Sequence, residues 1–550
     1  MMLLPKWIVR EALRSLCLAT GVTQKHCVTT TARMDTRKTE TRRSLIRRHP
    51  KGPPRTNFLS NAGTMPTAIP HALLLSLTVV ASSALLAPSA LEGQPATCRT
   101  SLDSLDSKVR TNYAGHLLEV TGNRAQAHTN LLHSLRGRAD TTPFRTCYPV
   151  LSAYTQWYAD PHLFVFQSQS ADTATAHDVQ SRLRHMALTE EELRASIVRR
   201  RKVDAIEGIW YEGNLRLGVV PDPSGSPGAY VAVVLTADTV SWPVGTVRAE
   251  IQRMAPDRYR VKLWTRAFAE IDLLATLHRN DLLRLSPGIW GKAYPTDARR
   301  ADMLDPVDAH RPTVVVRQRS VVVSIPSHDP QYTRRLDSLI GAHDEAIRSR
   351  PLLIVDLRGN EGGGAGTTRA LNPYLASTTR KPTPYDSGTA VMLASPAQLA
   401  YARRIVGGDT SAAARRILQR LETETGSLVP LDGLPGSTGV EPSHAGNWRV
   451  AVMVDGGTVS AAEVLVLKAL RSTRAVVIGE ATAGALDYQS TQVISLGTGD
   501  RRWALGYPTI TAHADLPLRG MRGKGIAPAV RVRWSSVADP ITEMERRFAK

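Results

Sequence analysis

The spacing of apolar residues divides the chain into parts with different predicted structure. Residues 97–202 carry apolar side chains three and four positions apart, which predicts a mostly helical N-terminal region. Residues 203–300 hold short strand-like runs separated by glycine, proline and aspartate, which predicts a small β-rich module. In residues 305–540 short apolar runs alternate with helical patterns. Such alternation is typical of an α/β domain, in which helices connect buried parallel strands.

An uncharged apolar run near the N-terminus predicts export. Residues 72–87 are apolar or small and include no charged side chain. The run is shorter than the roughly 20 residues that a membrane span needs, so residues 65–96 are interpreted as a secretory signal peptide. The alternative is an uncleaved N-terminal membrane anchor. We therefore expect a periplasmic or extracellular protein, or one held at a membrane by this segment.

The net charge of +20 is concentrated at the N-terminus. Residues 1–64 contain 13 Lys or Arg and 3 Asp or Glu, and they contribute half of that charge. This segment has no sustained apolar period, which predicts a disordered extension; the alternative is that translation starts at Met65. The rest of the chain contains no nucleic-acid-binding motif. We expect no nucleic-acid partner, because such a function would rest on the N-terminal charge alone.

Two of the four cysteines, Cys98 and Cys147, remain after removal of the N-terminal segment. Two cysteines in an oxidising compartment predict one disulfide. Their spacing fits no metal site, and no cluster of histidine and cysteine elsewhere has zinc-ligand spacing. The sequence therefore predicts neither a structural metal nor a cofactor.

A buried strand at residues 352–356 leads into a glycine-rich turn that contains Gly362 and Gly363. The amides of such a turn can bind negative charge. Phosphate binding is disfavoured, because no Gly-Lys-Ser/Thr follows and Arg369 stands where a dinucleotide-binding motif places its last glycine. Two interpretations remain: an oxyanion hole for an acyl oxygen, or a tight structural turn that needs positive φ.

A second strand ends at two glycines, just before a helix that begins near Ser460. Ser460 and Glu463 form the Ser-x-x-Glu pattern of a capping box, so one interpretation is that the serine only caps the helix. The other interpretation uses the same geometry. The serine Oγ is then a nucleophile, and the Ala461 N–H stabilises an oxyanion at the positive end of the helix.

Together these segments resemble peptidase family S41, which includes the C-terminal processing proteases and the tricorn core. The resemblance rests on Asp-Leu-Arg-Gly-Asn-x-Gly-Gly at residues 356–363, Gly-Thr-x-Ser-Ala-Ala-Glu at 457–463, and Ile-Gly-Glu-Ala-Thr-Ala-Gly at 478–484. It implies a crotonase/ClpP-like α/β core that acts on a peptide or an unfolded protein. The site residues that it implies are Ser460 as nucleophile and an oxyanion hole formed by Ala461 with Gly362 or Gly363.

The lysine base of the processing proteases has no counterpart at the expected position. In that branch a lysine stands about 25 residues after the serine and activates it, and here that position is Ala485. Lys468 lies about 12 Å beyond Ser460 along the helix axis, which is too far for direct proton transfer. Nothing in the sequence supports Lys524 as the base. A Ser-Lys dyad is therefore disfavoured.

The histidine-using branch of the family carries an Asp-x-His motif before the core, and Asp160-Pro161-His162 resembles it. This resemblance implies His162 as the general base that takes the serine proton. His328, at a predicted strand end, is the competing candidate.

The C-terminal part departs from the family pattern. Many members of the histidine branch carry an acidic residue before a Gly-Val/Ile-x-Pro-Asp ending, whereas this chain has Arg522 and Ala529 near those positions. The acid that orients the base is therefore open among Asp160, Asp487 and Asp515. The β-rich module also lacks the carboxylate-binding loop of a PDZ domain. The leading hypothesis is an exported serine endopeptidase, and the alternative is a catalytically inactive peptide-binding protein on the same fold.

Overall fold

The computed structural model describes residues 97–549 with several gaps. The extension predicted at residues 1–64 and the signal or anchor predicted at residues 65–96 lie outside the described residues. All described residues belong to one compact unit, and none of their helices is long and apolar enough to cross a membrane. The gaps are 168–178, 237–241, 266–269, 286–287, 297–303, 380, 384–388, 407–410, 433–442, 498–502 and 519.

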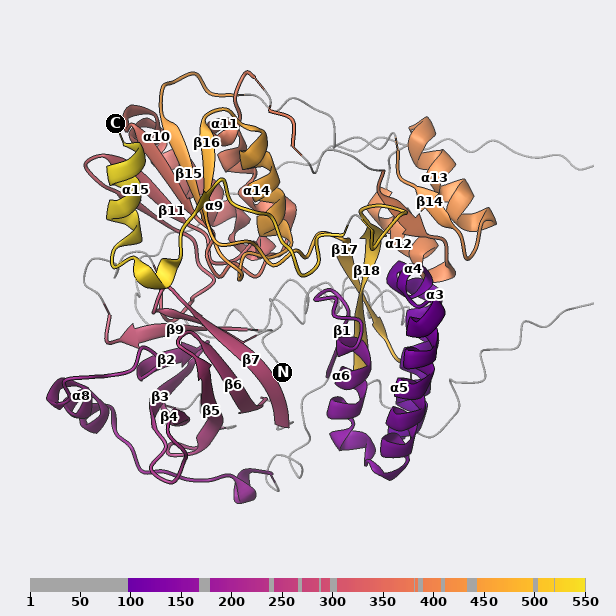
Figure 1. Ribbon diagram of the computed structural model, residues 1–550, viewed down its shortest axis with the longest axis horizontal. Helices are drawn as coiled ribbons and strands as arrows, with labels where there is room; N and C mark the ends of the chain where they lie inside the picture. The colour runs from indigo at the N-terminus through magenta and orange to yellow at the C-terminus, as the bar shows by residue number, and fades with distance from the viewer. Residues whose placement is uncertain are drawn as a thin grey trace, which may run out of the picture. The chain divides into compact units, whose positions relative to one another are not determined.

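Three helices build the N-terminal region: α3 (Cys98–Asn112), α5 (Gly122–Thr141) and α6 (Tyr148–Gln156). Their apolar faces enclose one core cluster, which also receives side chains from strands near the C-terminus (Figure 1). The disulfide predicted between Cys98 and Cys147 is confirmed. It joins the start of α3 to the residue that precedes α6, the helix that leads towards His162.

Residues 208–294 form a closed antiparallel barrel, where the sequence predicted only a β-rich module. The first and last strands pair with each other, with Ile209 opposite Tyr294. Alternate side chains point inward and fill the interior, as in other small barrels. The helix α8 (Glu190–Arg199) packs against the outside of the barrel. The strands are β2 (Gly208–Glu212), β3 (Leu215–Pro221), β4 (Ala229–Thr236), β5 (Val247–Ala255), β6 (Arg258–Trp264), β7 (Glu270–His278), β8 (Leu282–Arg284) and β9 (Ile289–Tyr294).

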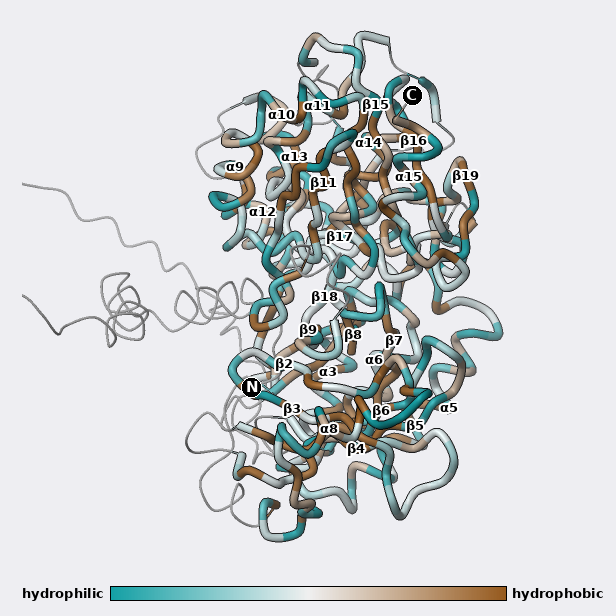
Figure 2. The backbone as a smooth tube through the Cα atoms, turned by 90° about the vertical axis from the view of Figure 1, so that its left-hand side faces the viewer, coloured by the Kyte–Doolittle hydropathy of each residue, from teal (hydrophilic) through white to brown (hydrophobic). Residues whose placement is uncertain are grey.

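The α/β core is built on a sheet with strand order β10-β11-β12-β15-β16-β19, in which all neighbours except β10 and β11 are parallel. Hydrophobic positions follow β11 and β15 in Figure 2. The bounds are β10 (Thr313–Val316), β11 (Ser320–Ser324), β12 (Leu352–Asp356), β15 (Arg449–Val454), β16 (Ala475–Gly479) and β19 (Val530–Arg531).

Helices cover both faces of this sheet, and every position of β12 is therefore buried. The helices α9 and α14 pack on one face, and α15 packs on the other. Because β12 and β15 are parallel neighbours, the turns that follow them leave the sheet at the same edge. The bounds are α9 (Thr333–Ala342), α10 (Asp344–Ser349), α14 (Ala461–Arg471) and α15 (Pro540–Phe548).

A second sheet connects the N-terminal helices with the C-terminal part of the chain (Figure 1). Its central strand β18 pairs with β17 and with β1, where Val165 stands opposite Leu505. Since β1 begins two residues after His162, this pairing fixes the end of the loop that carries the histidine. The bounds are β1 (Phe164–Gln167), β13 (Val391–Leu393), β14 (Leu428–Pro430), β17 (Tyr488–Ser495) and β18 (Trp503–Thr511).

The remaining elements are short or lie at the margin of these layers. The helices α12 and α13 pack on β13 and β14. Their bounds and those of the short helices are α12 (Pro396–Val406), α13 (Ala412–Thr423), α4 (Ala114–Glu119), η1 (Phe144–Thr146), η3 (Pro330–Tyr332), η4 (Ala365–Leu371), α11 (Asn372–Leu375) and η5 (Trp534–Ser536).

Candidate active site

Ser460 stands at the N-terminus of α14, directly after the turn that follows β15. Its backbone has φ 56° and ψ −115°, a combination that an L-residue rarely adopts and that typically costs about 1–3 kcal/mol. Two contacts hold this conformation. The Ser460 N–H donates to the Glu463 carboxylate at 2.9 Å, and the Val459 N–H donates to the Asn360 carbonyl at 2.9 Å. Glu463 thus serves the capping role predicted from the sequence.

The glycine-rich turn after β12 lies directly against this serine. Gly362 has a φ of 87°, which favours glycine, and a Cβ added there would lie 2.9 Å from the Ser460 Cβ and 2.8 Å from the Val459 carbonyl oxygen. No side chain fits in that space. The two sequence segments that were singled out separately therefore form one site, although they are about a hundred residues apart.

His162 reaches the same site from the loop between α6 and β1. Its Nε2 lies 2.9 Å from the Ser460 Oγ, which is hydrogen-bonding distance. Both residues are half-buried. When the serine hydroxyl donates to Nε2, the proton of the neutral imidazole is on Nδ1. The competing candidate His328 has no hydrogen bond to Ser460.

The carboxylate of Asp160 lies near the Nδ1 side of the His162 imidazole. Its Oδ1 lies 3.7 Å from the His162 Nδ1 and accepts the His162 backbone N–H at 2.9 Å, while its Oδ2 accepts the Tyr113 hydroxyl at 2.8 Å. Asp160 is buried, so these bonds fix its carboxylate. The Nδ1–Oδ1 separation is longer than a hydrogen bond, and Nδ1 has no hydrogen-bond partner among the described residues.

Asp487 and Arg522 have structural contacts near this loop. Asp487 accepts the backbone N–H groups of Met521 at 2.7 Å and of Arg522 at 3.1 Å, and so shapes the turn at residues 520–525. The Arg522 guanidinium pairs with Glu119 at 2.5 Å and donates to the Tyr158 carbonyl at 3.0 Å. Arg522, where the family pattern has an acid, thus holds the backbone two residues before Asp160.

His328 forms part of the wall of the glycine turn. It is fully buried, and its Nδ1 lies 3.1 Å from the Asn360 Oδ1. Burial lowers the pKa of His328 to about 4, so the imidazole is neutral near pH 7. Its backbone N–H donates to the Gly362 carbonyl, and its carbonyl accepts the Gly364 N–H. These contacts make His328 a support for the turn.

The backbone amides near Ser460 differ in their partners. The Ala461 N–H is the first of α14 and has no acceptor within the helix. The Gly362 N–H donates to the Asn360 Oδ1 at 2.8 Å. The bridge between His328 and Gly363 is parallel and uses the groups of Gly362 and Gly364, so the Gly363 N–H points away from His328. Of the two glycines named from the sequence, Gly363 has the amide better placed to meet an external acceptor.

A buried contact between His278 and Asp455, which the sequence did not predict, lies next to the turn before Ser460. The His278 Nδ1, at the end of β7 in the barrel, is 2.5 Å from the Asp455 Oδ2 in the turn before Ser460. Burial by itself would raise the pKa of Asp455. The attraction to His278 and the hydrogen bonds from His278 and the Gly359 N–H have a larger, opposite effect, so the pKa of Asp455 lies below its ordinary value. The only sequence signal was Asp455 itself, a carboxylate directly after a buried strand; nothing marked His278.

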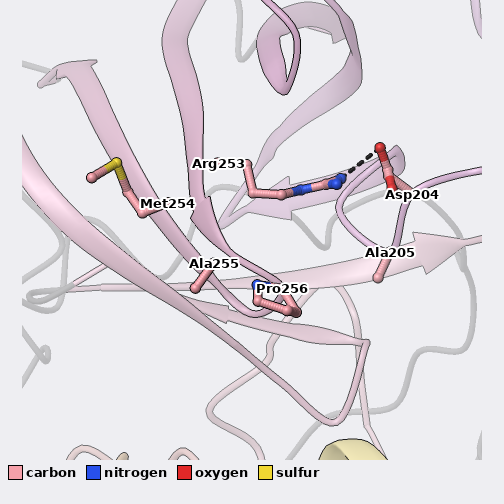
Figure 3. A pocket seen from close by; sticks show the side chains of 6 residues that line it. All are labelled: Asp204, Ala205, Arg253, Met254, Ala255 and Pro256. Carbon is pink, nitrogen blue, oxygen red and sulfur yellow. Dashed lines mark ion pairs between the residues drawn. The ribbon is translucent and has the colours of Figure 1, made fainter.

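A candidate metal site is absent from the described part of the chain. Among the described residues, no group of three or more His, Cys, Asp or Glu side chains is arranged to hold a metal ion. A pocket in the barrel, drawn in Figure 3, contains the ion pair between Arg253 and Asp204 but none of the residues discussed above. Its lining residues are Asp204, Ala205, Arg253, Met254, Ala255 and Pro256.

Residues 320–532 match the model of peptidase family S41, which supports a peptidase of this family for that part of the chain. No curated protein sequence matches the chain significantly. Among solved structures, mature CPAF in complex with lactacystin is 12% identical, with a TM-score of 0.39, over 79% of this chain and 94% of CPAF. The photosystem II D1 C-terminal processing protease is 13% identical, with a TM-score of 0.31, over 82% of this chain and 97% of that chain. The tricorn protease is 12% identical, with a TM-score of 0.33, over 82% of this chain and 36% of that chain.

Proposed function

We propose that this chain, in which residues 320–532 match peptidase family S41, is an exported serine endopeptidase that works through an acyl-enzyme. One observation carries the proposal: the His162 Nε2 lies 2.9 Å from the Ser460 Oγ, at the N-terminus of a helix. A hydroxyl is a weak nucleophile at neutral pH, and a base at this distance can activate it.

In the proposed reaction, the Ser460 Oγ attacks the carbonyl carbon of a peptide bond and passes its proton to the His162 Nε2. The negative charge that develops on the carbonyl oxygen is stabilised by the Ala461 N–H and the Gly362–Gly363 turn, where the Gly363 amide is the favoured donor. His162 then protonates the leaving amine. Water, activated by the same imidazole, hydrolyses the acyl ester and regenerates the serine.

Several finer assignments belong to this proposal. The parallel sheet with helices on both faces agrees with a crotonase/ClpP-like core of the histidine-using branch. The apolar run at residues 72–87 and the Cys98–Cys147 disulfide favour export to an oxidising compartment. The substrate is a peptide or an unfolded protein, because the nucleophile needs an accessible, extended main chain.

The direct test is Ser460→Ala, with labelling by a fluorophosphonate probe and cleavage of an unstructured peptide as readouts. We expect the variant to lose both, because Ser460 carries the only described hydroxyl that is hydrogen-bonded to His162. Ser536→Ala is a matched control at an exposed turn and should behave as wild type. Undiminished labelling or cleavage by Ser460→Ala would remove Ser460 from the mechanism.

The second candidate is a catalytically inactive protein that binds peptides on the same fold. The separation of 3.7 Å between Asp160 and the imidazole favours it, because an orienting acid in a serine triad is directly hydrogen-bonded. It predicts saturable binding of an unstructured peptide, with neither cleavage nor fluorophosphonate labelling of the wild-type protein between pH 6 and pH 9. Labelling of Ser460 would exclude it.

A further inference from the structure

Side chains of the barrel reach the turns of the proposed active site, and His278 is in contact with both turns. His278 is buried at the end of β7 and lies between the two turns that carry the proposed catalytic groups. A Cβ added at Gly457 would lie 2.5 Å from the His278 Cε1, and a Cβ added at Gly359 would lie 3.1 Å from the His278 Cβ. His278 thus lies against both turns, and at Gly457 its imidazole leaves no room for a side chain.

The partner of this imidazole connects the two turns. One oxygen of the Asp455 carboxylate, Oδ2, is hydrogen-bonded to the His278 Nδ1 at 2.5 Å. The other oxygen, Oδ1, accepts the N–H of Gly359 at 2.9 Å and the N–H of Gly457 at 2.9 Å. Gly359 lies three residues before Gly362, and Gly457 lies three residues before Ser460. A rotation of the Asp455 carboxylate would therefore move both the nucleophile and the oxyanion amides.

A second contact from the barrel acts on the same turn. The Arg284 Nη1, on β8, donates to the Gly457 carbonyl at 2.9 Å. The carbonyl and the amide of Gly457 are therefore both held, one by the barrel directly and the other through Asp455. No barrel side chain in the described structure is hydrogen-bonded to Ser460 or His162, whose polar side-chain partners are each other, Glu463 and Asp160. The contacts of His278 and Arg284 act on the turns instead.

We propose that His278 is a positioning residue of the peptidase, through which the barrel fixes the geometry of Ser460 relative to the oxyanion amides. This inference rests on the proposed function. It assigns the barrel a role in catalysis in addition to any role in substrate binding. Because a displacement of about 1 Å can cost about a hundredfold in rate, loss of the His278–Asp455 bond should lower kcat far more than it changes KM.

The test compares His278→Ala with His278→Asn in the full-length protein. Asparagine keeps an N–H donor close to the position of the imidazole Nδ1, whereas alanine removes it. We expect His278→Ala to lower kcat and the rate of fluorophosphonate labelling by about a hundredfold, with less than about a threefold change in KM. His278→Asn should recover most of that loss. A kcat for His278→Ala within about twofold of wild type, or no recovery in His278→Asn, would overturn the proposal.

Lys292→Met controls for simple damage to the barrel. Lys292 is buried on β9 and donates to the Ala205 carbonyl at 2.6 Å, within the barrel and its flanking segment. Its replacement should lower the melting temperature as much as His278→Ala does, but leave kcat near the wild-type value. An equal loss of kcat in both variants would show that barrel stability alone controls activity, and would overturn the assignment.

Hydrogen exchange separates failure of this inference from failure of the proposed function. In His278→Ala the peptides that cover residues 357–363 and 455–461 should lose protection, because the bonds from Gly359 and Gly457 to Asp455 weaken. The peptides of α14 should keep theirs. If wild type is not labelled by the probe, the peptidase proposal fails, while the exchange result still decides whether His278 holds the turns. Unchanged protection in both turns would contradict that role.

Discussion

At the scale of single residues, the backbone of Ser460 belongs to the cap of α14 while its side chain faces the proposed base. The Glu463 carboxylate accepts a hydrogen bond from the Ser460 backbone N–H, while the Ser460 Oγ is within hydrogen-bonding distance of His162. The cost of the strained φ is offset by bonds made on both sides of the residue. An outlier of this kind is typical of functional sites, where neighbouring contacts over-determine the backbone.

Asp160 is the residue whose replacement best tests how the base is oriented. Asp160→Asn keeps the size of the side chain but removes the negative charge beside the imidazolium that forms during attack. We expect kcat to fall by about a hundredfold, less than the roughly 10⁴-fold loss for an acid in direct contact, because the carboxylate is 3.7 Å from Nδ1. The measurement is kcat for a peptide substrate.

Tyr113→Phe is the matched control, since it removes one hydrogen bond to Asp160 and leaves the charge in place. Its kcat should fall by less than that of Asp160→Asn, because the carboxylate and its negative charge remain beside the imidazole. If Asp160→Asn retained kcat within twofold of wild type, Asp160 would have no part in orienting His162.

At the scale of secondary structure, the start of α14 depends on one buried carboxylate. Glu463 accepts the Ser460 N–H and, from the segment after β16, the Thr482 hydroxyl and the N–H groups of Gly484 and Ala485. Glu463→Gln replaces an acceptor oxygen with an NH₂ group, so at least one backbone donor loses its partner. We expect a loss of about 1–3 kcal/mol in the free energy of unfolding, measured by urea denaturation.

The control for this change is Glu480→Gln at an exposed site, where the carboxylate accepts the Trp534 N–H. Surface substitutions of this kind usually change stability by less than about 0.5 kcal/mol. An equally small effect of Glu463→Gln would mean that the four contacts do not stabilise the start of α14.

Local signals predicted the elements around the site well. The helix predicted to begin near Ser460 begins at Ala461, because Glu463 caps its first turn and its apolar face is regular. Apolar spacing alone predicts one helix over residues 331–347, but in the structure α9 ends at Ala342 and α10 begins at Asp344, with a break at His343. There the backbone N–H and the imidazole both turn back to the Leu339 carbonyl, at 3.2 Å and 2.8 Å. This competition between side chain and backbone is invisible in apolar spacing.

At the scale of the whole molecule, buried histidines should make stability depend on pH. The pKa of His328 is about 4 in the folded protein because of burial, against about 6.5 in an unfolded chain. The unfolded state therefore binds more protons between these values, and stability falls as the pH falls from about 6.5 to 4. For His328 the loss between pH 7 and pH 4.5 is about 2 kcal/mol.

The measurement is urea unfolding of wild type and His328→Asn at pH 7 and pH 4.5. We expect the variant to be less stable than wild type at pH 7, because a buried side chain is replaced. Between pH 7 and pH 4.5, however, its free energy of unfolding should fall by less than that of wild type. His116, whose pKa burial also lowers to about 4, adds a fall of the same sign to both proteins, so their difference isolates His328. If the free energy of unfolding fell equally in wild type and His328→Asn, the pKa of His328 would have to lie near its ordinary value.

Contacts between distant parts of the sequence limited what could be predicted. Alternating strands indicated a β-rich module, but barrel closure depends on pairing between β2 and β9, which no local pattern specifies. The approach of His162 to Ser460 was expected only through the family resemblance, since 298 residues separate them. His278 carried no motif, and its importance appears only when the barrel and the core are seen packed together.

The pairing of β1 with β18 sets an order of events during synthesis. His162 leaves the ribosome 298 residues before Ser460, yet the strand that holds its loop ends only at Thr511. A nascent chain that already contains both residues still lacks the support that brings them together. Under the proposed function, we therefore expect peptidase activity to appear only after β18 has been synthesised and has paired with β1.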